Sequence, residues 1–135
     1  MSIYRIALIV ALAMAITACA STKDFTCKGN EQLAIHDALY FGTAKPNGVV
    51  LSEEWAEFLK GTVTPRFPQG LTAWQASGQW RSDGSIVRES SHVLTLVHPD
   101  DELSEKAVLE IVGTYKSKFQ QESVLRVRSP ACVSF

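Results

Sequence analysis

The order in which two periodicities follow one another along the chain constrains its fold more than any other feature. Alternation with a period of two residues, typical of half-buried strands, occurs in four segments, and helical periodicity occurs in two. The expected strands are residues 33–42, 70–76, 86–98 and 123–128. The expected helices begin at Ser52 and after residues 99–101. Right-handed crossovers turn this β-α-β-β-α-β order into a ferredoxin-like α+β sandwich, with strand order 4-1-3-2 and two helices on one face of an antiparallel sheet.

Each expected helix has one apolar face. Ser52 is the expected N-cap of the first, whose apolar residues are Trp55, Phe58, Leu59 and Val63, and Pro65 and Pro68 end it. The second helix has apolar residues at every fourth position and two beside them: Leu103, Ala107, Ile111, Tyr115, Phe119, Val108 and Val112. Turns are expected at residues 45–48 and 82–84.

The N-terminal segment is typical of an export signal. Residues 6–16 are eleven consecutive apolar residues, preceded by the positive charge of Arg5. This run is too short to span a bilayer, which needs about 20 residues, but it suits a signal peptide. The sequence ITAC at residues 16–19 resembles a bacterial lipobox, in which the sulfur of Cys19 receives a diacylglycerol and the leader is cut before it. The alternative is a plain secretory leader cut near Ala18 or Ala20.

These features divide the chain into a signal peptide (1–18), a lipidated tether (19–32) and a single domain (33–135). Ala20, rather than Asp, follows the cysteine, and resemblance to Gram-negative lipoproteins then favours the outer membrane, with the domain facing the periplasm. The membrane is therefore an expected partner, through the lipid on Cys19. The chain has 13 basic and 14 acidic residues, and this balance argues against nucleic acid as a partner.

Two cysteines remain after the lipobox, Cys27 and Cys132. An even pair in an oxidising compartment predicts a disulfide. Cys27 precedes the first strand and Cys132 follows the fourth, and these strands are neighbours, so the topology brings both cysteines to the same end of the sheet. The alternative is two free buried thiols. A metal site is disfavoured because no histidine lies at ligand spacing from either cysteine.

A polar pocket is expected at the opposite end of the sheet. In this interpretation the first and third strands finish there, at Tyr40–Gly42 and His98, and the second and fourth begin there, after Arg66–Gln69 and Gln121–Glu122. The second helix also begins there, and its N–H groups favour an anion. Together, the residues of this pocket would bind an organic acid or phosphate ester, or let His98 act as an acid or base. Structural roles are the alternatives: Arg66 capping the first helix, His98 at a strand end, and Gln121 satisfying backbone groups.

The sheet face without helices is a second candidate surface. Trp74 and Trp80 lie on or just after the second expected strand, where one of them would suit an interface or a stacked ligand. Alternatively, both complete the core on the helix side. The GxSxG, P-loop and HExxH patterns are absent from the sequence. His92 and His98 lie roughly 20 Å apart along one strand, too far to share a metal. No catalytic residue, metal or cofactor is therefore assigned.

Several segments resemble the bacterial domain of unknown function 3574. They are LYFG (39–42), TPRFPQGLT (64–72), GQW (78–80), the Arg88–Glu89 pair, LVHPD (96–100) and YKSKFQQESVLRV (115–127). The resemblance covers about 90 residues, and members of that family often carry a leader or lipobox. It implies a domain and a compartment but no activity. It also implies positions that the family shares, namely Arg66, Gly70, Gln79, Trp80, Glu89 and Gln121.

The leading hypothesis is an outer-membrane lipoprotein whose domain binds a small anionic or apolar ligand or a protein, with a homodimer formed through the open sheet face. The candidate ligand-binding residues are Tyr40, Arg66, Gln79, Trp80, Glu89, His98 and Gln121. The second hypothesis is a small cofactor-independent enzyme that resembles ferredoxin-like α/β-barrel monooxygenases or related isomerases and uses His98 with Arg66. The third is a structural envelope protein without a ligand.

Overall fold

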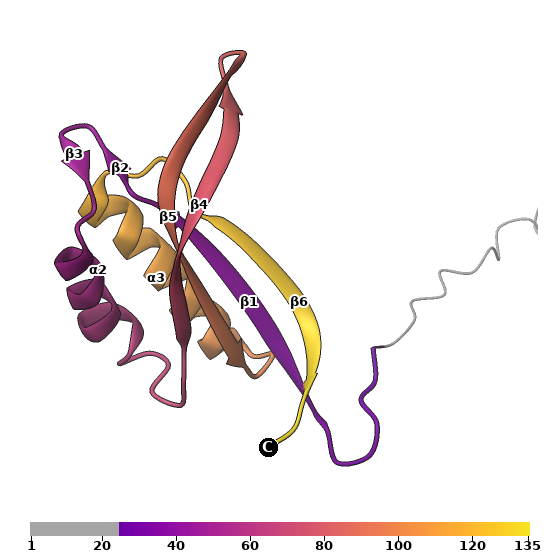
Figure 1. The fold of residues 1–135 in the computed structure, drawn as a ribbon. Helices are drawn as coiled ribbons and strands as arrows, with labels where there is room; N and C mark the ends of the chain where they lie inside the picture. Colours follow the sequence, from indigo (N-terminus) through magenta and orange to yellow (C-terminus); the bar gives the residue numbers. More distant parts are fainter. Residues whose placement is uncertain (1–24) are drawn as a thin grey trace, which may run out of the picture.

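The computed structural model describes residues 25–135, so the expected leader and Cys19 lie outside the described residues. The elements follow in the order β1 (Gln32–Gly42), β2 (Ala44–Lys45), β3 (Gly48–Val49), α2 (Ser52–Phe58), η1 (Leu59–Val63), β4 (Thr72–Ser82), β5 (Ser85–His98), α3 (Glu102–Phe119) and β6 (Leu125–Val133) (Figure 1). No helix within this part of the chain is both long and apolar enough to cross a bilayer.

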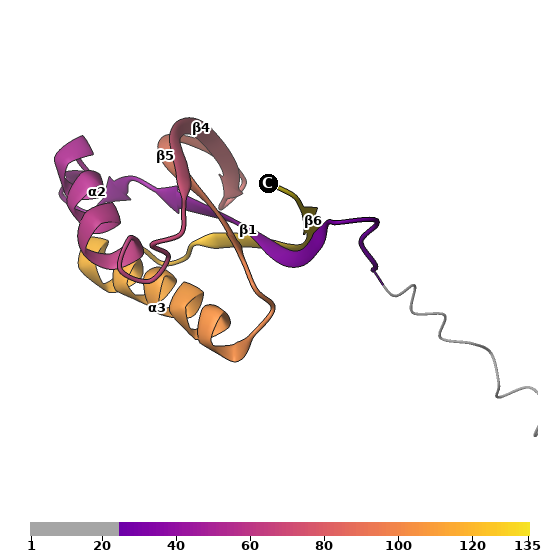
Figure 2. The ribbon, with the colours of Figure 1, turned by 90° about the horizontal axis from the view of Figure 1, so that it is seen from below.

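The four long strands form one antiparallel sheet in the order β4-β5-β1-β6, and β2 and β3 form a separate small hairpin. The helices α2 and α3 both lie on one face of the large sheet, and the other face is left uncovered (Figure 2). Numbered by their order along the chain, these strands have the predicted order 4-1-3-2. The predicted ferredoxin-like α+β fold is confirmed.

Two strands are longer than predicted. β4 runs to Ser82 and pairs with β5 as far as Ser85, so Gln79 and Trp80 lie on the strand. Asp83 and Gly84, with φ angles of 47° and 80°, connect the two strands. Asp-Gly suits a two-residue hairpin turn, which needs positive φ at both positions. The β4–β5 hairpin therefore projects past the helices (Figure 1).

The first helix begins at its predicted cap, one residue earlier than expected. Ser52 is the first residue of α2 and Leu51 is the N-cap, so the prediction for Ser52 is wrong. The carboxylate of Glu54 accepts a hydrogen bond from the backbone N–H of Leu51 at 2.8 Å and takes over the capping role. The chain then widens into the π-helical turn η1, where the N–H of Thr64 donates to the carbonyl of Leu59 at 2.8 Å.

The second helix is capped as its sequence indicates. Asp101 accepts a hydrogen bond from the backbone N–H of Ser104 at 2.7 Å, and Gln120, with φ 54°, ends α3 in a left-handed conformation. Leu103 departs from the predicted apolar face, because its side chain is 80% exposed. It lies roughly 120° around the helix axis from the buried row, which is Val108, Ile111, Tyr115 and Phe119.

The core between the sheet and the helices is built around aromatic side chains. Phe41 of β1 contacts Trp55, Phe58 and Tyr115, with ring centroids 5.3, 6.0 and 4.5 Å away. The hydroxyl of Tyr115 donates a hydrogen bond to the carbonyl of Gly42 at 2.8 Å. Burial raises the pKa of this phenol. The helices are therefore fixed to the end of β1 both by packing and by a buried polar contact.

Cys27 and Cys132 form the predicted disulfide, with their Cα atoms 5.5 Å apart. Cys132 lies within β6, opposite Leu33 of β1, instead of in a tail after the last strand. β6 runs on to Val133 because the apolar residues near the C-terminus continue to pair with β1. The disulfide therefore links the segment before β1 to the strand beside it.

Candidate functional site

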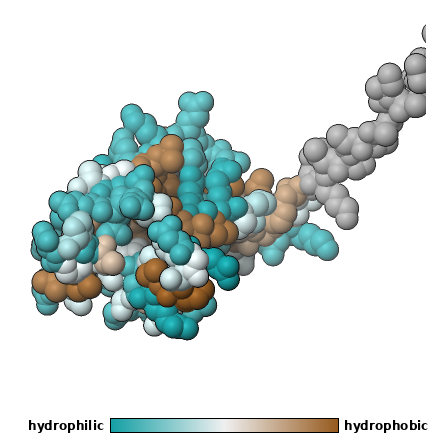
Figure 3. All heavy atoms as spheres, turned by 90° about the horizontal axis from the view of Figure 1, so that it is seen from above, coloured by the Kyte–Doolittle hydropathy of each residue, from teal (hydrophilic) through white to brown (hydrophobic). Residues whose placement is uncertain are grey.

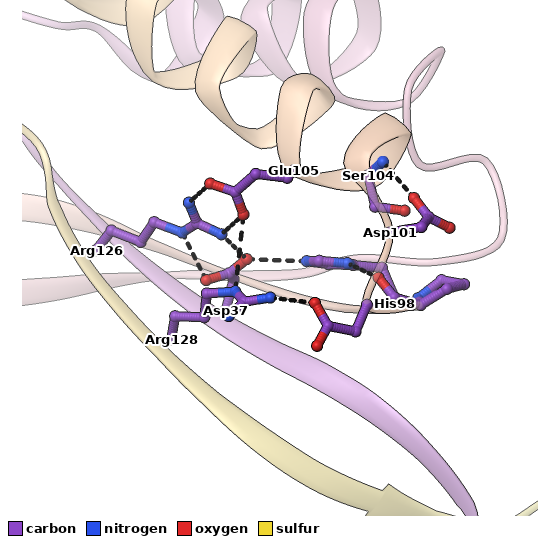
Figure 4. A network of polar contacts seen from close by, with 9 residues as sticks. Asp37, His98, Asp101, Ser104, Glu105, Arg126 and Arg128 are labelled. Carbon is purple, nitrogen blue, oxygen red and sulfur yellow. Dashed lines mark hydrogen bonds and ion pairs between the residues drawn. The ribbon is translucent and has the colours of Figure 1, made fainter.

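A buried ionic network joins α3 to the sheet (Figure 4). Asp37 of β1 is 0% exposed. Arg126 of β6 donates to both of its carboxylate oxygens, from Nε to Oδ1 and from Nη2 to Oδ2, each at 2.7 Å. The same guanidinium donates to both oxygens of Glu105 on α3, at 2.6 and 2.7 Å. Such paired, charge-assisted hydrogen bonds fix the geometry of all three groups.

His98 completes this network. Its Nε2 lies 2.9 Å from Oδ2 of Asp37, and its Nδ1 lies 2.7 Å from the carbonyl oxygen of Pro99. Burial by itself would raise the pKa of Asp37, but hydrogen bonds from Arg126 and His98 outweigh it, and the pKa lies below its ordinary value. Each ring nitrogen of His98 already faces an oxygen atom of the protein. The arrangement is that of a structural ion-pair network that holds α3 against the sheet, and it does not favour acid–base catalysis by His98.

A hollow of about 450 Å³ lies over the start of α3. It is lined by Asp100, Asp101, Glu102, Glu105 and Arg128. Three of its four carboxylates are engaged, because Asp101 caps the helix, Glu105 binds Arg126 and Asp100 accepts a hydrogen bond from Arg128. Most polar groups of this hollow thus have structural partners, and we assign it no candidate binding role.

The structure separates the residues of the expected pocket. β1 and β5 are antiparallel, so His98 lies opposite Ile35, near the disulfide, whereas Gly42 lies opposite Ser91. The prediction that the first and third strands finish at the same end is therefore wrong. Tyr40 lies near the end of β1, far along the strand from His98. Neither of the two hollows described here is lined by Arg66 or His98.

Arg66 and Gln121 bond to nearby groups. Arg66 donates from Nη1 to the carbonyl of Thr62 at 2.7 Å and from Nε to Glu110 at 3.1 Å. It therefore caps the end of the first helical segment. The Nε2 of Gln121 donates to the carbonyls of Ala44 and Phe119. These contacts match the structural alternatives for both residues, and no observation favours the hypothesis of an enzyme that uses Arg66 with His98.

The uncovered sheet face carries a group of apolar side chains. Trp74 of β4, Val93 of β5, Tyr40 of β1 and Leu125 of β6 are successive partners across the sheet. They alternate along their strands with core residues and so face away from the helices. Trp80 has the same strand parity as Trp74. Both tryptophans are therefore directed away from the helix-side core, with Trp74 47% exposed.

A second hollow lies between the β2–β3 hairpin, the start of α2 and the β4–β5 hairpin, and we call it the hairpin hollow. Its volume is about 450 Å³, within the range of small-molecule sites. It is lined by Thr43, Ala44, Val49, Val50, Leu51, Ser52, Gln75, Arg88, Glu89, Ser90 and His92. Figure 3 looks onto the end of the molecule from which both hairpins project and shows a mostly hydrophilic surface broken by separate apolar patches.

On the helix-facing side of the β4–β5 hairpin, the apolar side chains of the core are followed by polar ones. Ala73 and Leu94 are the last apolar pair on the helix-facing side. The next pairs on that side are Gln75 with His92, Ser77 with Ser90, and Gln79 with Arg88. The strands continue here past the helices that cover the core. A polar ladder, defined by these three pairs, therefore borders the hairpin hollow.

His92 lies where the polar ladder meets the core. Its ring stacks on that of Trp55, with centroids 4.4 Å apart and planes at 5°, and the residue is only 7% exposed. Burial lowers its pKa, which favours the neutral imidazole. Within residues 25–135, neither ring nitrogen has a hydrogen-bond partner and neither is fully buried, and the residue lines the hairpin hollow. A buried imidazole thus offers one donor and one acceptor to the hollow.

Arg88 and Glu89 bring opposite charges to the hairpin hollow. Glu89 accepts a hydrogen bond from the backbone N–H of Ala44 at 3.0 Å. Its carboxylate lies so close to Gly42 that a Cβ at that position would collide with it. Among the described residues, Arg88 forms neither a side-chain hydrogen bond nor an ion pair. The carboxylate is committed to the backbone, and the guanidinium is available.

Glu89 of the hairpin hollow and Gln79 of the polar ladder were predicted from the sequence, whereas His92 and Gln75 were not. A signal for His92 is present in the sequence: it has the parity of Leu94 and Leu96, which face the core. Elsewhere, Cys27, Glu31 and Cys132 offer ligand atoms within 4.8 Å of one another, but the disulfide occupies both sulfurs. The hairpin hollow is therefore the candidate functional site.

The fold and the hairpin hollow define a small ferredoxin-like α+β domain with a polar, partly buried site beside its central hairpin. Residues 36–135 match the family described as "Protein of unknown function (DUF3574)". The chain belongs to this family, and the resemblance seen in its sequence motifs is confirmed. No curated protein sequence shows significant similarity to the chain.

Solved structures with a similar fold are distant in sequence. A phage SAM lyase in complex with S-methyl-5'-thioadenosine is 15% identical with a TM-score of 0.55, and the match covers 83% of this chain and 95% of that one. CutA from Synechococcus elongatus is 10% identical with a TM-score of 0.51, and the match covers 75% of this chain and 82% of that one. At these identities the likeness shows the fold alone.

Proposed function

We propose that this protein is a membrane-anchored module that binds a small ligand in the hairpin hollow. The observation that carries the proposal is His92, a buried imidazole that faces the hollow without a hydrogen-bond partner among the described residues. Among the described residues no buried side-chain nitrogen or oxygen lacks a partner, so the ring nitrogens of His92 are accessible from the hollow and able to bind a ligand there. The volume of about 450 Å³ suits a small organic compound.

The proposed anchor is the lipid on Cys19, with the domain facing the periplasm from the outer membrane. The apolar run and the ITAC sequence at residues 16–19 support it. The disulfide between Cys27 and Cys132 also supports it, because disulfides persist in oxidising compartments such as the periplasm. Two or three acyl chains would hold the protein firmly on the membrane.

An NMR screen of small metabolites against the full-length protein in detergent micelles tests the binding function. We expect at least one compound to shift the ring signals of His92 and the backbone amide of Ser90. In the His92→Phe variant the aromatic ring still stacks on Trp55 but lacks both nitrogens, and we expect it to lose binding. His36→Phe, on the uncovered sheet face, is the matched control and should bind normally. If no compound perturbs the hollow, the proposed function is wrong.

We further propose that two copies associate through the uncovered sheet face. Trp74, Tyr40, Leu125 and Val127 are all exposed there, Leu125 at 61%. In the register, Tyr40 lies beside Leu125, and the buried Val93 of β5 lies between Tyr40 and Trp74. Contiguous apolar side chains of this kind, aromatic ones above all, are typical of interfaces.

Sedimentation of the full-length protein in density-matched detergent tests this association. We expect a dimer for the wild type and a monomer for Trp74→Arg, since a charge placed in an apolar interface has no partner there. Leu103→Arg is the control, because Leu103 is an exposed apolar residue on α3, on the opposite side of the sheet. A monomeric wild type, or a Leu103→Arg variant that dissociates as readily as Trp74→Arg, contradicts the proposed interface.

A further inference from the structure

The charges around the hairpin hollow favour an anionic ligand. Arg88 lines it and has no hydrogen-bond or ion-pair partner among residues 25–135. The one carboxylate, from Glu89, already accepts a hydrogen bond from Ala44. Of the remaining groups, the amide of Gln75 and the hydroxyl of Ser52 are able to donate. Arg88 is therefore the uncommitted charge of the lining, and neutral donors lie in the same hollow.

The same residues limit the charge of a ligand that the hairpin hollow can bind. Arg88 is the only cationic residue in the lining, and Glu89 adds a negative charge at the edge of the hollow. Arg88 and Glu89 together leave the lining without net charge, so a second negative charge on a ligand would have no cation there to pair with. A guanidinium presents parallel N–H donors that match the two oxygens of a carboxylate. A monocarboxylate therefore fits better than a phosphate.

One wall of the hairpin hollow is apolar. Val49, Val50 and Leu51 line the hollow from the end of the β2–β3 hairpin and the segment that leads into α2. Val49 and Leu51 are exposed, so both have surface that a ligand would bury. Contact with these residues would favour an organic acid over a fully hydrated inorganic anion.

We infer that the hairpin hollow binds a small organic monocarboxylate, whose carboxylate pairs with Arg88, whose polar edge contacts His92 and whose apolar end packs on Val49 and Leu51. This inference rests on the proposed binding function and names the class of ligand for that site. Arg88 supplies the charge-assisted hydrogen bonds and His92 supplies a neutral partner. Gln75, directly opposite His92 in the strand register, provides a further polar contact.

Four probes of similar size test the class of ligand: butyrate, butyramide, butylammonium and inorganic phosphate. Binding is followed by NMR and calorimetry on the full-length protein in detergent micelles. We expect butyrate to bind and to shift the ring signals of His92, and the other three probes to bind far more weakly. Arg88→Ala should weaken butyrate binding by about tenfold to a hundredfold, the range for hydrogen bonds to charged groups. Arg88→Lys, which keeps the charge but loses the planar fork, should fall between.

Arg81→Ala is the matched control, because Arg81 is an exposed arginine on the same hairpin and does not line the hollow. It should bind butyrate like the wild type. If butyramide or butylammonium binds the hollow as tightly as butyrate, or if Arg88→Ala is unaffected, the carboxylate assignment is wrong while the binding function stands. Arg88-dependent binding that is tighter for phosphate than for butyrate also overturns the assignment. If no probe and no screened metabolite binds, the binding function itself fails.

Discussion

Replacing Arg126 with methionine is expected to lower the free energy of unfolding by about 3–5 kcal/mol, the cost of removing one partner from a buried ion pair. The variant leaves Asp37 charged and 0% exposed, with His98 as its remaining side-chain partner. It also frees Glu105 and so loosens α3 from β6. Urea denaturation followed by circular dichroism measures the loss.

Arg128→Met is the control for this prediction. Arg128 pairs with Asp100 at the surface, and exposed ion pairs contribute only about 0–1 kcal/mol. The double variant Asp37→Leu with Arg126→Met should recover part of the loss, because it removes the buried charge together with its partner. If Arg126→Met lowers the free energy of unfolding no more than Arg128→Met does, the buried network stabilises the fold no more than a surface ion pair.

The effect of Arg126→Met depends on pH in a defined direction. The pKa of Asp37 is lowered in the folded protein, so its contribution to stability is present above the pKa of the unfolded chain. That unfolded pKa is about 3.9. The contribution of Asp37 to stability is lost as the pH falls through its lower pKa in the folded protein. The difference in stability between wild type and variant should therefore be full at neutral pH and shrink in acid.

Removing the disulfide is the second change with a large expected effect. In the Cys27→Ser, Cys132→Ser double variant, the free energy of unfolding should fall by up to about 4–5 kcal/mol, because the disulfide closes a long loop and restricts the unfolded chain. The two cysteines are 105 residues apart in sequence, so almost the whole domain lies inside the loop. Thermal and urea unfolding of the oxidised proteins measure the difference.

A reducing agent provides the internal control for the disulfide. It should lower the stability of the wild type toward that of the double variant and leave the double variant unchanged. Equal unfolding free energies for the oxidised wild type and the double variant would show that the disulfide adds nothing to the fold.

The fold was predictable because the order of strand and helix periodicities is compatible with few topologies. The same pattern also contained Asp37, which has the strand parity of Ile35, Leu39 and Phe41. Its burial could not be predicted from this parity, because burying a carboxylate is costly unless a partner comes from elsewhere in the chain. Its partner, Arg126, is 89 residues away, and periodicity carries no information about such a pair.

The hairpin hollow was harder to predict for a different reason. Residues 77–82 of β4 have no alternation of apolar side chains, so nothing local indicated that the strand continues to Ser82. Pairing with β5 extends it, and pairing is a property of the whole sheet. The misplaced pocket around His98 arose from the direction of the third strand, since neighbouring strands of this sheet run antiparallel. Residue types alone could not reveal that Arg88 and His92 share a hollow.

The position of the disulfide determines how the domain responds to a mechanical load. A pull on the chain before Cys27 reaches β1 directly and reaches β6 through the sulfur bridge. The two strands share the force at the same end of the sheet, so neither is peeled from the other. The hairpin hollow lies toward the other end of β1, beyond Gly42, outside this line of tension. Traction from the N-terminal side would therefore leave the geometry around His92 and Arg88 undisturbed.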